Sequence, residues 1–109
     1  MVSILAEAID LVTGDRQATY GPPERDYARV AAMTSAALGA EWTACDALVQ
    51  MLAVKLARIG HGVSEDFTAD MLRDSLVDLA GYADCLHRAL LARDEARPPI
   101  NTRQGDHHD

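Results

Sequence analysis

Apolar residues recur every three or four positions in four segments of the chain, which is the period of an α-helix with one buried face. The first segment covers residues 4–13, the second 23–38, the third 44–59 and the fourth 68–95. The fourth segment is the longest of them. This pattern predicts an all-α fold that resembles a four-helix bundle and has one long C-terminal helix.

Capping residues, glycines and prolines set the expected ends of these helices. Ser3 can cap the first helix and Gly14 can end it, and Thr43 with Asp46 three residues later resembles a capping box. We expect Gly60 and Gly62 to end the third helix near residue 59. The polar residues 15–22 lie before a helix that begins at Pro23, so we expect them to form a loop.

The fourth segment also carries a heptad-like seam. Its members are separated by four and three residues in turn, and they are Leu72, Leu76, Leu79, Ala83, Leu86 and Leu90. In the third helix the expected core stripe is Leu48, Leu52, Leu56 and Ile59. About 28 residues at 1.5 Å each give a helix of roughly 40 Å, longer than its neighbours can cover in one small monomer. We therefore expect a homo-oligomer, either a dimer or a tetramer.

The length of 109 residues allows one domain, which we assign to residues 1–96, followed by a disordered tail over 97–109. Hydrophobic residues make up 49% of the chain but aromatic residues only 5%, so we expect a core of small side chains on closely packed helices. Cys45 and Cys85 have no metal-ligand spacing, and we interpret them as reduced core thiols.

The charge and the N-terminus narrow the possible surroundings and partners. Seventeen acidic residues against ten basic ones give a net charge of −7, which disfavours binding to nucleic acid. Glu7 and Asp10 interrupt the N-terminal segment before any signal-like apolar run forms, and no run approaches the length of a membrane span. We expect a cytoplasmic protein without a membrane partner.

Four aspartates follow one another at intervals of four residues and form an acidic stripe: Asp66, Asp70, Asp74 and Asp78. Like charges at this spacing repel on a helix, so the stripe should attract cations. One interpretation is an ion-pair cluster with Lys55 and Arg58 of the third helix. The other is that Asp74 and Asp78 bind Mg²⁺ while Lys55 and Arg58 contact the phosphates of a substrate.

The expected loop between Gly14 and Gly21 collects groups that suit a nucleotide. Arg16 can bind a phosphate, Tyr20 can stack on a base, and Gln17 can bind a polar edge. The alternative is an ordinary surface connection in which Tyr20 packs against the bundle and Arg16 pairs with a nearby acid.

Three stretches together resemble a group of small, mostly phage-encoded proteins of unassigned function. They are Leu-Val-x-Gly-Asp-Arg-Gln-x-x-Tyr-Gly-x-Pro at 11–23, Leu-x-x-Lys-Leu-Ala-Arg-Ile at 52–59 and Asp-Ser-Leu-Val-Asp-Leu-Ala-Gly-Tyr-Ala at 74–83. That group is in turn distantly similar to the MazG-like nucleoside triphosphate pyrophosphohydrolases. These are helical oligomers that use helix-borne carboxylates and Mg²⁺ to split nucleoside triphosphates into a monophosphate and pyrophosphate.

The resemblance implies roles for particular residues. It places Asp74 and Asp78 as ligands of Mg²⁺ and as catalytic residues together with Lys55, and it places substrate contacts at Arg16, Gln17, Tyr20, Arg58 and Tyr82. The superfamily's Glu-x-x-Glu pair on the preceding helix has no counterpart here. Two hypotheses follow: a Mg²⁺-dependent pyrophosphohydrolase of phage nucleotide metabolism, or a non-catalytic phage protein that sequesters a nucleotide or a nucleotide-derived defence signal.

Overall fold

The structure is a computed structural model that describes residues 3–97. It contains five helices, and the described residues form no strand. They are α1 (Ile4–Thr13), α2 (Asp15–Tyr20), α3 (Pro23–Leu38), α4 (Ala44–Ser64) and α5 (Ala69–Ala96). The all-α fold and the long final helix are confirmed. Within the described part of the chain, no helix combines the length and the apolar character that a membrane crossing requires.

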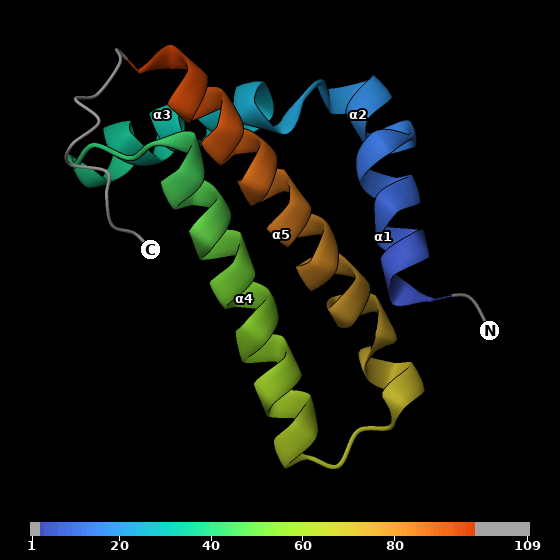
Figure 1. The fold of residues 1–109 in the computed structure, drawn as a ribbon. Helices are drawn as coiled ribbons and strands as arrows, with labels where there is room; N and C mark the ends of the chain where they lie inside the picture. Colours follow the sequence, from blue (N-terminus) through green and yellow to red (C-terminus); the bar gives the residue numbers. More distant parts are fainter. Residues whose placement is uncertain (1–2, 98–109) are drawn as a thin grey trace, which may run out of the picture.

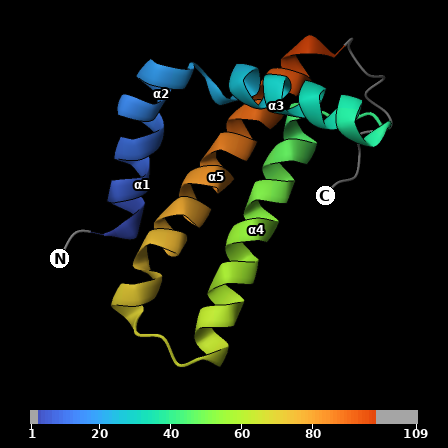
Figure 2. The same cartoon turned by 180° about the vertical axis from the view of Figure 1, so that it is seen from behind.

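The helix α5 is the centre of the fold. It packs against α4 on one side and against α1 on the other, and these three helices lie side by side in one layer (Figure 1). The helix α3 lies across one end of the layer, where it contacts both α4 and α5 (Figure 2). The short helix α2 connects α1 to α3 at that same end. The first helix, α1, therefore packs directly against the last helix, α5.

Side-chain caps begin three of the helices as the sequence predicts. Ser3 accepts a hydrogen bond from the amide of Leu5 at 3.1 Å, and Thr68 accepts one from Met71 at 3.2 Å. Thr43 and Asp46 form a complete capping box, in which each side chain accepts from the other residue's backbone amide. These local bonds explain why the predicted starts of α1, α4 and α5 are correct.

Two predicted boundaries are wrong. Residues 15–20 form α2 rather than a loop, because the amide of Ala18 bonds to the carbonyl of Gly14 and the turn closes at Gly21, whose φ is 83°. The helix α4 continues through Gly60 and Gly62 to Ser64. Gly62 is buried against α5 and the connecting loop, where a β-carbon would lie 2.5 Å from Leu72. This glycine permits a close contact between helices and does not end one.

The buried face of α5 also differs from the predicted heptad seam. Its buried residues are spaced four apart and small, namely Val77, Gly81, Cys85 and Ala89. A β-carbon on Gly81 would lie only 3.2 Å from Val12 of α1. Since neighbours pack on both sides of α5, the leucines of the predicted seam are only half-buried, and the small residues occupy the line of closest approach.

The core is small and poor in aromatic residues, as the composition predicts. Its cluster consists of Val12, Leu48, Cys85 and Ala89, with Tyr27, Cys45, Tyr82 and Leu86 packed against it. Cys85 belongs to this cluster and Cys45 packs against it, as expected of core thiols. Leu56, predicted to belong to the core stripe of the third helix, is instead 57% exposed on the outer face of α4. The single domain over residues 1–96 stays a prediction, and the predicted tail, apart from Arg97, lies outside the described residues.

Candidate functional site

A small cavity of about 40 Å³ lies where α1, α2, α3 and α5 converge. Its polar lining comes from Gln17, Tyr20, Asp26, Tyr27, Asp78 and Tyr82, and its apolar lining includes Leu11, Val12, Val77 and Cys85. The cavity thus combines three phenol rings with two carboxylates from different helices. Pockets that enclose a small organic ligand usually measure roughly 300–1,000 Å³, so this cavity is smaller than the pocket that such a ligand occupies.

Two tyrosines form the inner wall of the cavity. The rings of Tyr27 in α3 and Tyr82 in α5 meet edge to face, with their centroids 6.2 Å apart and their planes at 83°. Burial raises the pKa of Tyr27 well above the usual value of a phenol, and a hydrogen bond with Tyr82 raises it further. Tyr27 therefore keeps its proton at neutral pH and presents an uncharged wall to the cavity.

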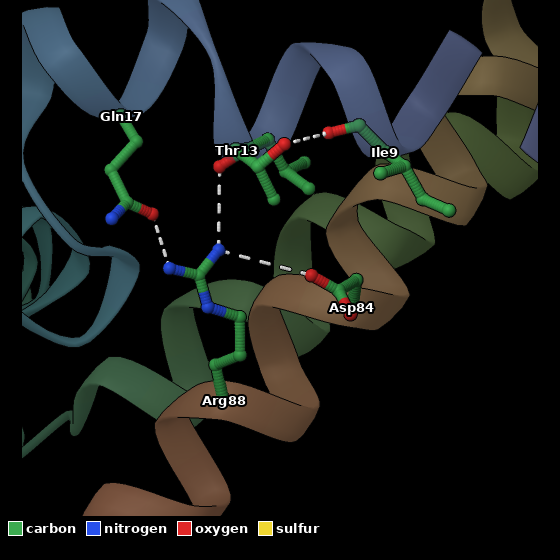
Figure 3. A network of polar contacts seen from close by, with 6 residues as sticks. Ile9, Thr13, Gln17, Asp84 and Arg88 are labelled. Atoms are coloured by element: carbon green, nitrogen blue, oxygen red, sulfur yellow. Dashed lines mark hydrogen bonds and ion pairs between the residues drawn. The ribbon is translucent and has the colours of Figure 1, made fainter. Parts of the chain in front are cut away.

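The outer wall, α2, is fastened to α5 by Arg88 (Figure 3). The guanidinium of Arg88 donates to the side-chain oxygen of Gln17 and, at 3.3 Å, to the carbonyl of Val12 near the end of α1. Asp84, one turn earlier on α5, lies 3.8 Å from the same guanidinium. One arginine therefore binds the end of α1, the middle of α2 and its own helix, and it uses the amide oxygen of Gln17 that was expected to contact a ligand.

A second arginine holds the other end of α2. Arg29 of α3 donates to the carbonyl of Tyr20 at 3.1 Å and lies 3.6 Å from the carboxylate of Asp26. Tyr20 itself is 54% exposed at the rim of the cavity. The rim therefore places a guanidinium, an exposed aromatic ring and a carboxylate next to one another.

Asp78 lines the cavity and also forms an ion pair with a residue of α4. Its carboxylate lies 2.8 Å from the ammonium of Lys55, whose side chain is only 12% exposed. The ion-pair interpretation of the acidic stripe is therefore correct for Asp78. Asp74, one turn away, is exposed and does not line the cavity, and Asp66 occupies the loop before α5 with a φ of 58°.

The donor set does not match the metal site that the resemblance implies. Over residues 3–97, histidine, cysteine and acidic side chains do not gather in any group of three or more that could hold a metal ion. Asp26 and Asp78 line the same cavity, but Lys55 already neutralises Asp78. Two-metal hydrolysis needs carboxylates that surround both ions, and these residues supply too few of them.

Arg58 lies away from the cavity. It borders an open groove of about 400 Å³ between the end of α4 and the start of α5, together with His61, Phe67 and Met71. The rings of His61 and Phe67 meet edge to face there. Although Lys55 and Arg58 are one turn apart on α4, the structure therefore assigns them to two different surroundings.

Four of the predicted site residues line the cavity: Gln17, Tyr20, Asp78 and Tyr82. Lys55 contacts one of them, whereas Asp74 and Arg58 lie elsewhere, and the side chain of Arg16 is outside the described part of the structure. Asp26 and Tyr27 were missed as site residues. A signal for them existed, because Pro23, Asp26, Tyr27 and Val30 share one helix face that begins directly after the Gly-Pro-Pro turn.

Comparison with known proteins shows that the chain is similar to phage proteins. Residues 3–90 match a family model described as "Domain of unknown function (DUF6378)". The chain is also 35% identical over 107 residues to the Gene 55 protein of Mycobacterium phage L5 and 37% identical over 87 residues to the Gene 55 protein of Mycobacterium phage D29. These matches cover 96% and 79% of this chain but 63% and 52% of the relatives, so the chain spans little more than half the length of the curated relatives it matches. No solved structure matches.

Proposed function

Since this chain belongs to the DUF6378 family, we propose that it acts in the host cytoplasm as a phage protein that binds a nucleotide or a nucleotide-derived small molecule. The site is the cavity between α2, α3 and α5. The observation that carries the proposal is the convergence of Tyr20, Tyr27 and Tyr82 with Asp26 and Asp78 around one cavity. Aromatic rings stack on any nucleobase, and carboxylates accept hydrogen bonds from the amino and imino groups of its edge.

The small volume of the cavity bears on how a ligand enters. The cavity of about 40 Å³ does not enclose a base, and we infer that α2 moves away from α5 when a base enters. Gly14 and Gly21 flank this six-residue helix, and the contacts of Arg88 and Arg29 hold it in place. A ligand that displaces the contact between Gln17 and Arg88 can then bind both the amide of Gln17 and the guanidinium of Arg88. Arg88 and Arg29 contact α2, and we assign the phosphate contacts to them and, from the sequence alone, to Arg16.

Binding without cleavage is the form of this function that the geometry supports best. Asp78 is paired with Lys55, Asp74 lies outside the cavity, and the described residues provide no third ligand for a metal. A protein of this kind sequesters its ligand, and in a phage the fitting target is a nucleotide-derived signal of host defence. This is the second of the two hypotheses that the sequence raises.

Mg²⁺-dependent pyrophosphohydrolysis, the function of the MazG-like enzymes, remains the second candidate because of one observation. Asp26 and Asp78 come from different helices and border the same cavity. A single Mg²⁺ ion is commonly bound by one or two carboxylates together with phosphate oxygens and water. In this candidate Asp78 exchanges Lys55 for the metal, and Lys55 then contacts a phosphate.

One experiment separates these functions. The purified chain is incubated with a mixed panel of ribonucleotides, deoxyribonucleotides and cyclic nucleotides, with and without Mg²⁺, and the filtrate and the protein-retained fraction are both analysed by chromatography. We expect an intact nucleotide in the retained fraction without added metal. Metal-dependent release of a monophosphate, lost in the Asp26→Asn and Asp78→Asn variants, would favour the hydrolase. A panel that passes unchanged into the filtrate would refute nucleotide binding.

Matched aromatic variants test the site itself. Tyr20→Ala removes an exposed ring at the rim of the cavity, and we expect it to weaken binding about tenfold, near the lower end of the measured stacking contributions. Phe67→Ala removes a ring of comparable exposure from the other groove and should leave binding unchanged. Equal losses in both variants would show that the ligand does not occupy the cavity.

A further inference from the structure

The outer face of α4 is apolar although no other helix covers it. Val49, Leu56 and Val63 are 55%, 57% and 63% exposed, and they are separated by seven residues each. Ala53 and Gly60 lie between them and are exposed as well, so the spacing along the face is four, three, four and three. We call these five residues the α4 seam. Their spacing is that of a helix that packs lengthwise against another helix.

The charge along α4 also favours a contact between this helix and another protein chain. Residues 47–64 contain no acidic residue, although the chain has seventeen acids among 109 residues. The cations on this stretch are Lys55, which pairs with α5, and Arg58, which borders the groove at the far end. A stretch of this kind is the part of a strongly acidic chain that a second acidic chain can approach with the least repulsion.

We propose that the α4 seam binds the α4 seam of a second copy of this chain, with the two helices antiparallel and a twofold axis at Leu56. The valines of the seam lie seven residues before and seven residues after Leu56, whereas Ala53 lies three before it and Gly60 four after it. When Leu56 faces its own counterpart, Val49 faces Val63 of the other copy, and Ala53 lies within one residue of the position opposite Gly60. Large residues thus meet large ones and small residues meet small ones, and Ala53 with Gly60 allows the two backbones to approach closely.

The weakness of the monomer core supports a second copy as the occupant. Among the described residues, the largest side chains that are fully buried are those of Leu48 and Val77, whereas thirteen large hydrophobic residues are exposed. The layer formed by α1, α5 and α4 leaves α4 at its edge, where a second layer can continue it (Figure 1). The ten exposed residues from Val49 to Ser64 are fewer than the roughly 20 per side of a standard interface, so we expect a weak dimer that dissociates on dilution.

A charge placed on the axis tests the dimer. We expect the chain to sediment as a dimer at high concentration and as a monomer after dilution. Leu56→Glu should give a monomer at every concentration, because it buries two facing carboxylates. The control is Leu91→Glu on α5, which changes a leucine of similar exposure, 50%, and should leave the dimer intact. A chain that is monomeric at all concentrations, or a dimer that survives Leu56→Glu, would overturn the proposal.

Cysteine cross-linking tests the orientation independently of any loss of stability. Leu56→Cys should form a disulfide-linked dimer on oxidation, because the residue faces itself across the axis. Val49→Cys alone should not, since 14 residues separate it along the helix from the position opposite its counterpart, a distance of about 21 Å. A mixture of Val49→Cys and Val63→Cys chains should form the linked dimer, and the unmodified chain with its two native cysteines provides the background. Cross-linking of Val49→Cys to itself would indicate parallel helices and contradict the proposal.

Discussion

Lys55 of α4 and Asp78 of α5 join the two longest helices directly beside the cavity, with 2.8 Å between ammonium and carboxylate. Lys55 is almost buried, whereas Asp78 remains one-third exposed and lines the cavity. This pair therefore stabilises the helix packing and also sets the charge of one cavity wall. A negative wall residue whose charge is already balanced accepts hydrogen bonds from a ligand without strongly attracting a metal ion.

Removal of this carboxylate should destabilise the fold. Asp78→Asn leaves the Lys55 ammonium in a mostly buried position without a counter-charge, and we expect a loss of about 2 kcal/mol in the free energy of unfolding. Urea unfolding measures it as a lower midpoint with an unchanged slope. The control Asp74→Asn changes an exposed aspartate one turn away and should stay within about 0.5 kcal/mol. Equal effects of the two variants would contradict a structural role of the ion pair.

Arg88 controls the attachment of α2. Arg88→Met keeps the apolar stem but removes the contacts with Gln17, the carbonyl of Val12 and Asp84. We expect a loss of about 1.5–3 kcal/mol in the free energy of unfolding. Amide hydrogen exchange should become faster over residues 15–21 and change less over α4. The control Arg93→Met removes a guanidinium that pairs with exposed Asp94 on the same helix, and it should leave exchange in α2 unchanged. Unchanged protection of α2 in Arg88→Met would show that packing alone holds this helix.

Tyr27 should make the fold sensitive to alkaline pH. Burial and the bond with Tyr82 raise its pKa in the folded chain, whereas the unfolded chain releases the proton near pH 10. Below pH 10 both states keep the proton and stability is unaffected. Above pH 10 the folded state binds more protons than the unfolded state, so the free energy of unfolding falls by up to about 1.4 kcal/mol per pH unit.

The variant Tyr27→Phe tests this assignment. It removes the titrating group, so the decline of the urea midpoint above pH 10 should become shallower than in the unmodified chain. A comparison of the two chains at pH 7 separates this effect from the simple loss of the hydrogen bond with Tyr82. Parallel pH profiles above pH 10 would assign the alkaline sensitivity to another residue.

Two glycines of the same helix should respond in opposite directions to the same substitution. Gly62→Ala places a methyl group 2.5 Å from Leu72 and 2.9 Å from Phe67, and we expect the free energy of unfolding to fall by about 1–3 kcal/mol. Gly60→Ala adds a methyl group in open space within a helix, and we expect a gain of about 0.5–1 kcal/mol. Thermal unfolding of dilute samples measures both effects without a contribution from association. Destabilisation by both would contradict the close contact at Gly62 as the cause.

Local sequence signals predict well where the helices begin, but they predict poorly which residues of other segments pack against them. Ser3, Thr43 and Thr68 fix the starts of three helices through bonds to amides two or three residues away, so the sequence alone suffices there. The role of Gly62 depends on Leu72, which is brought to it by the turn between α4 and α5. A glycine that allows close packing and a glycine that ends a helix look alike in the sequence, because the difference lies in what surrounds them.

The candidate site divides in the same way. Gln17, Tyr20, Asp78 and Tyr82 were predicted from their chemistry and from the resemblance, and all four line one cavity. Lys55 was one of the two cations expected to pair with the acidic stripe, and it pairs with Asp78. The contact of Arg88 with Gln17 could not be predicted, since it forms only after distant helices have packed. The heptad seam of α5 failed for a related reason: a repeat of leucines does not indicate that two neighbours, α1 and α4, approach the helix from opposite sides.

The long separation between Glu7 and Arg73 has a consequence for the order of folding. These residues pair at 2.7 Å across 66 positions, and Arg88 contacts Gln17 across 71, whereas α4 and α5 are joined by a short turn. Chain closure over a short loop costs less entropy than closure over a long one, so α4 and α5 should pair first and α1 with α2 should dock afterwards. The tyrosine-lined cavity is then completed in the last step of folding. We expect its outer wall, α2, to be the first part of the cavity to open when the chain unfolds.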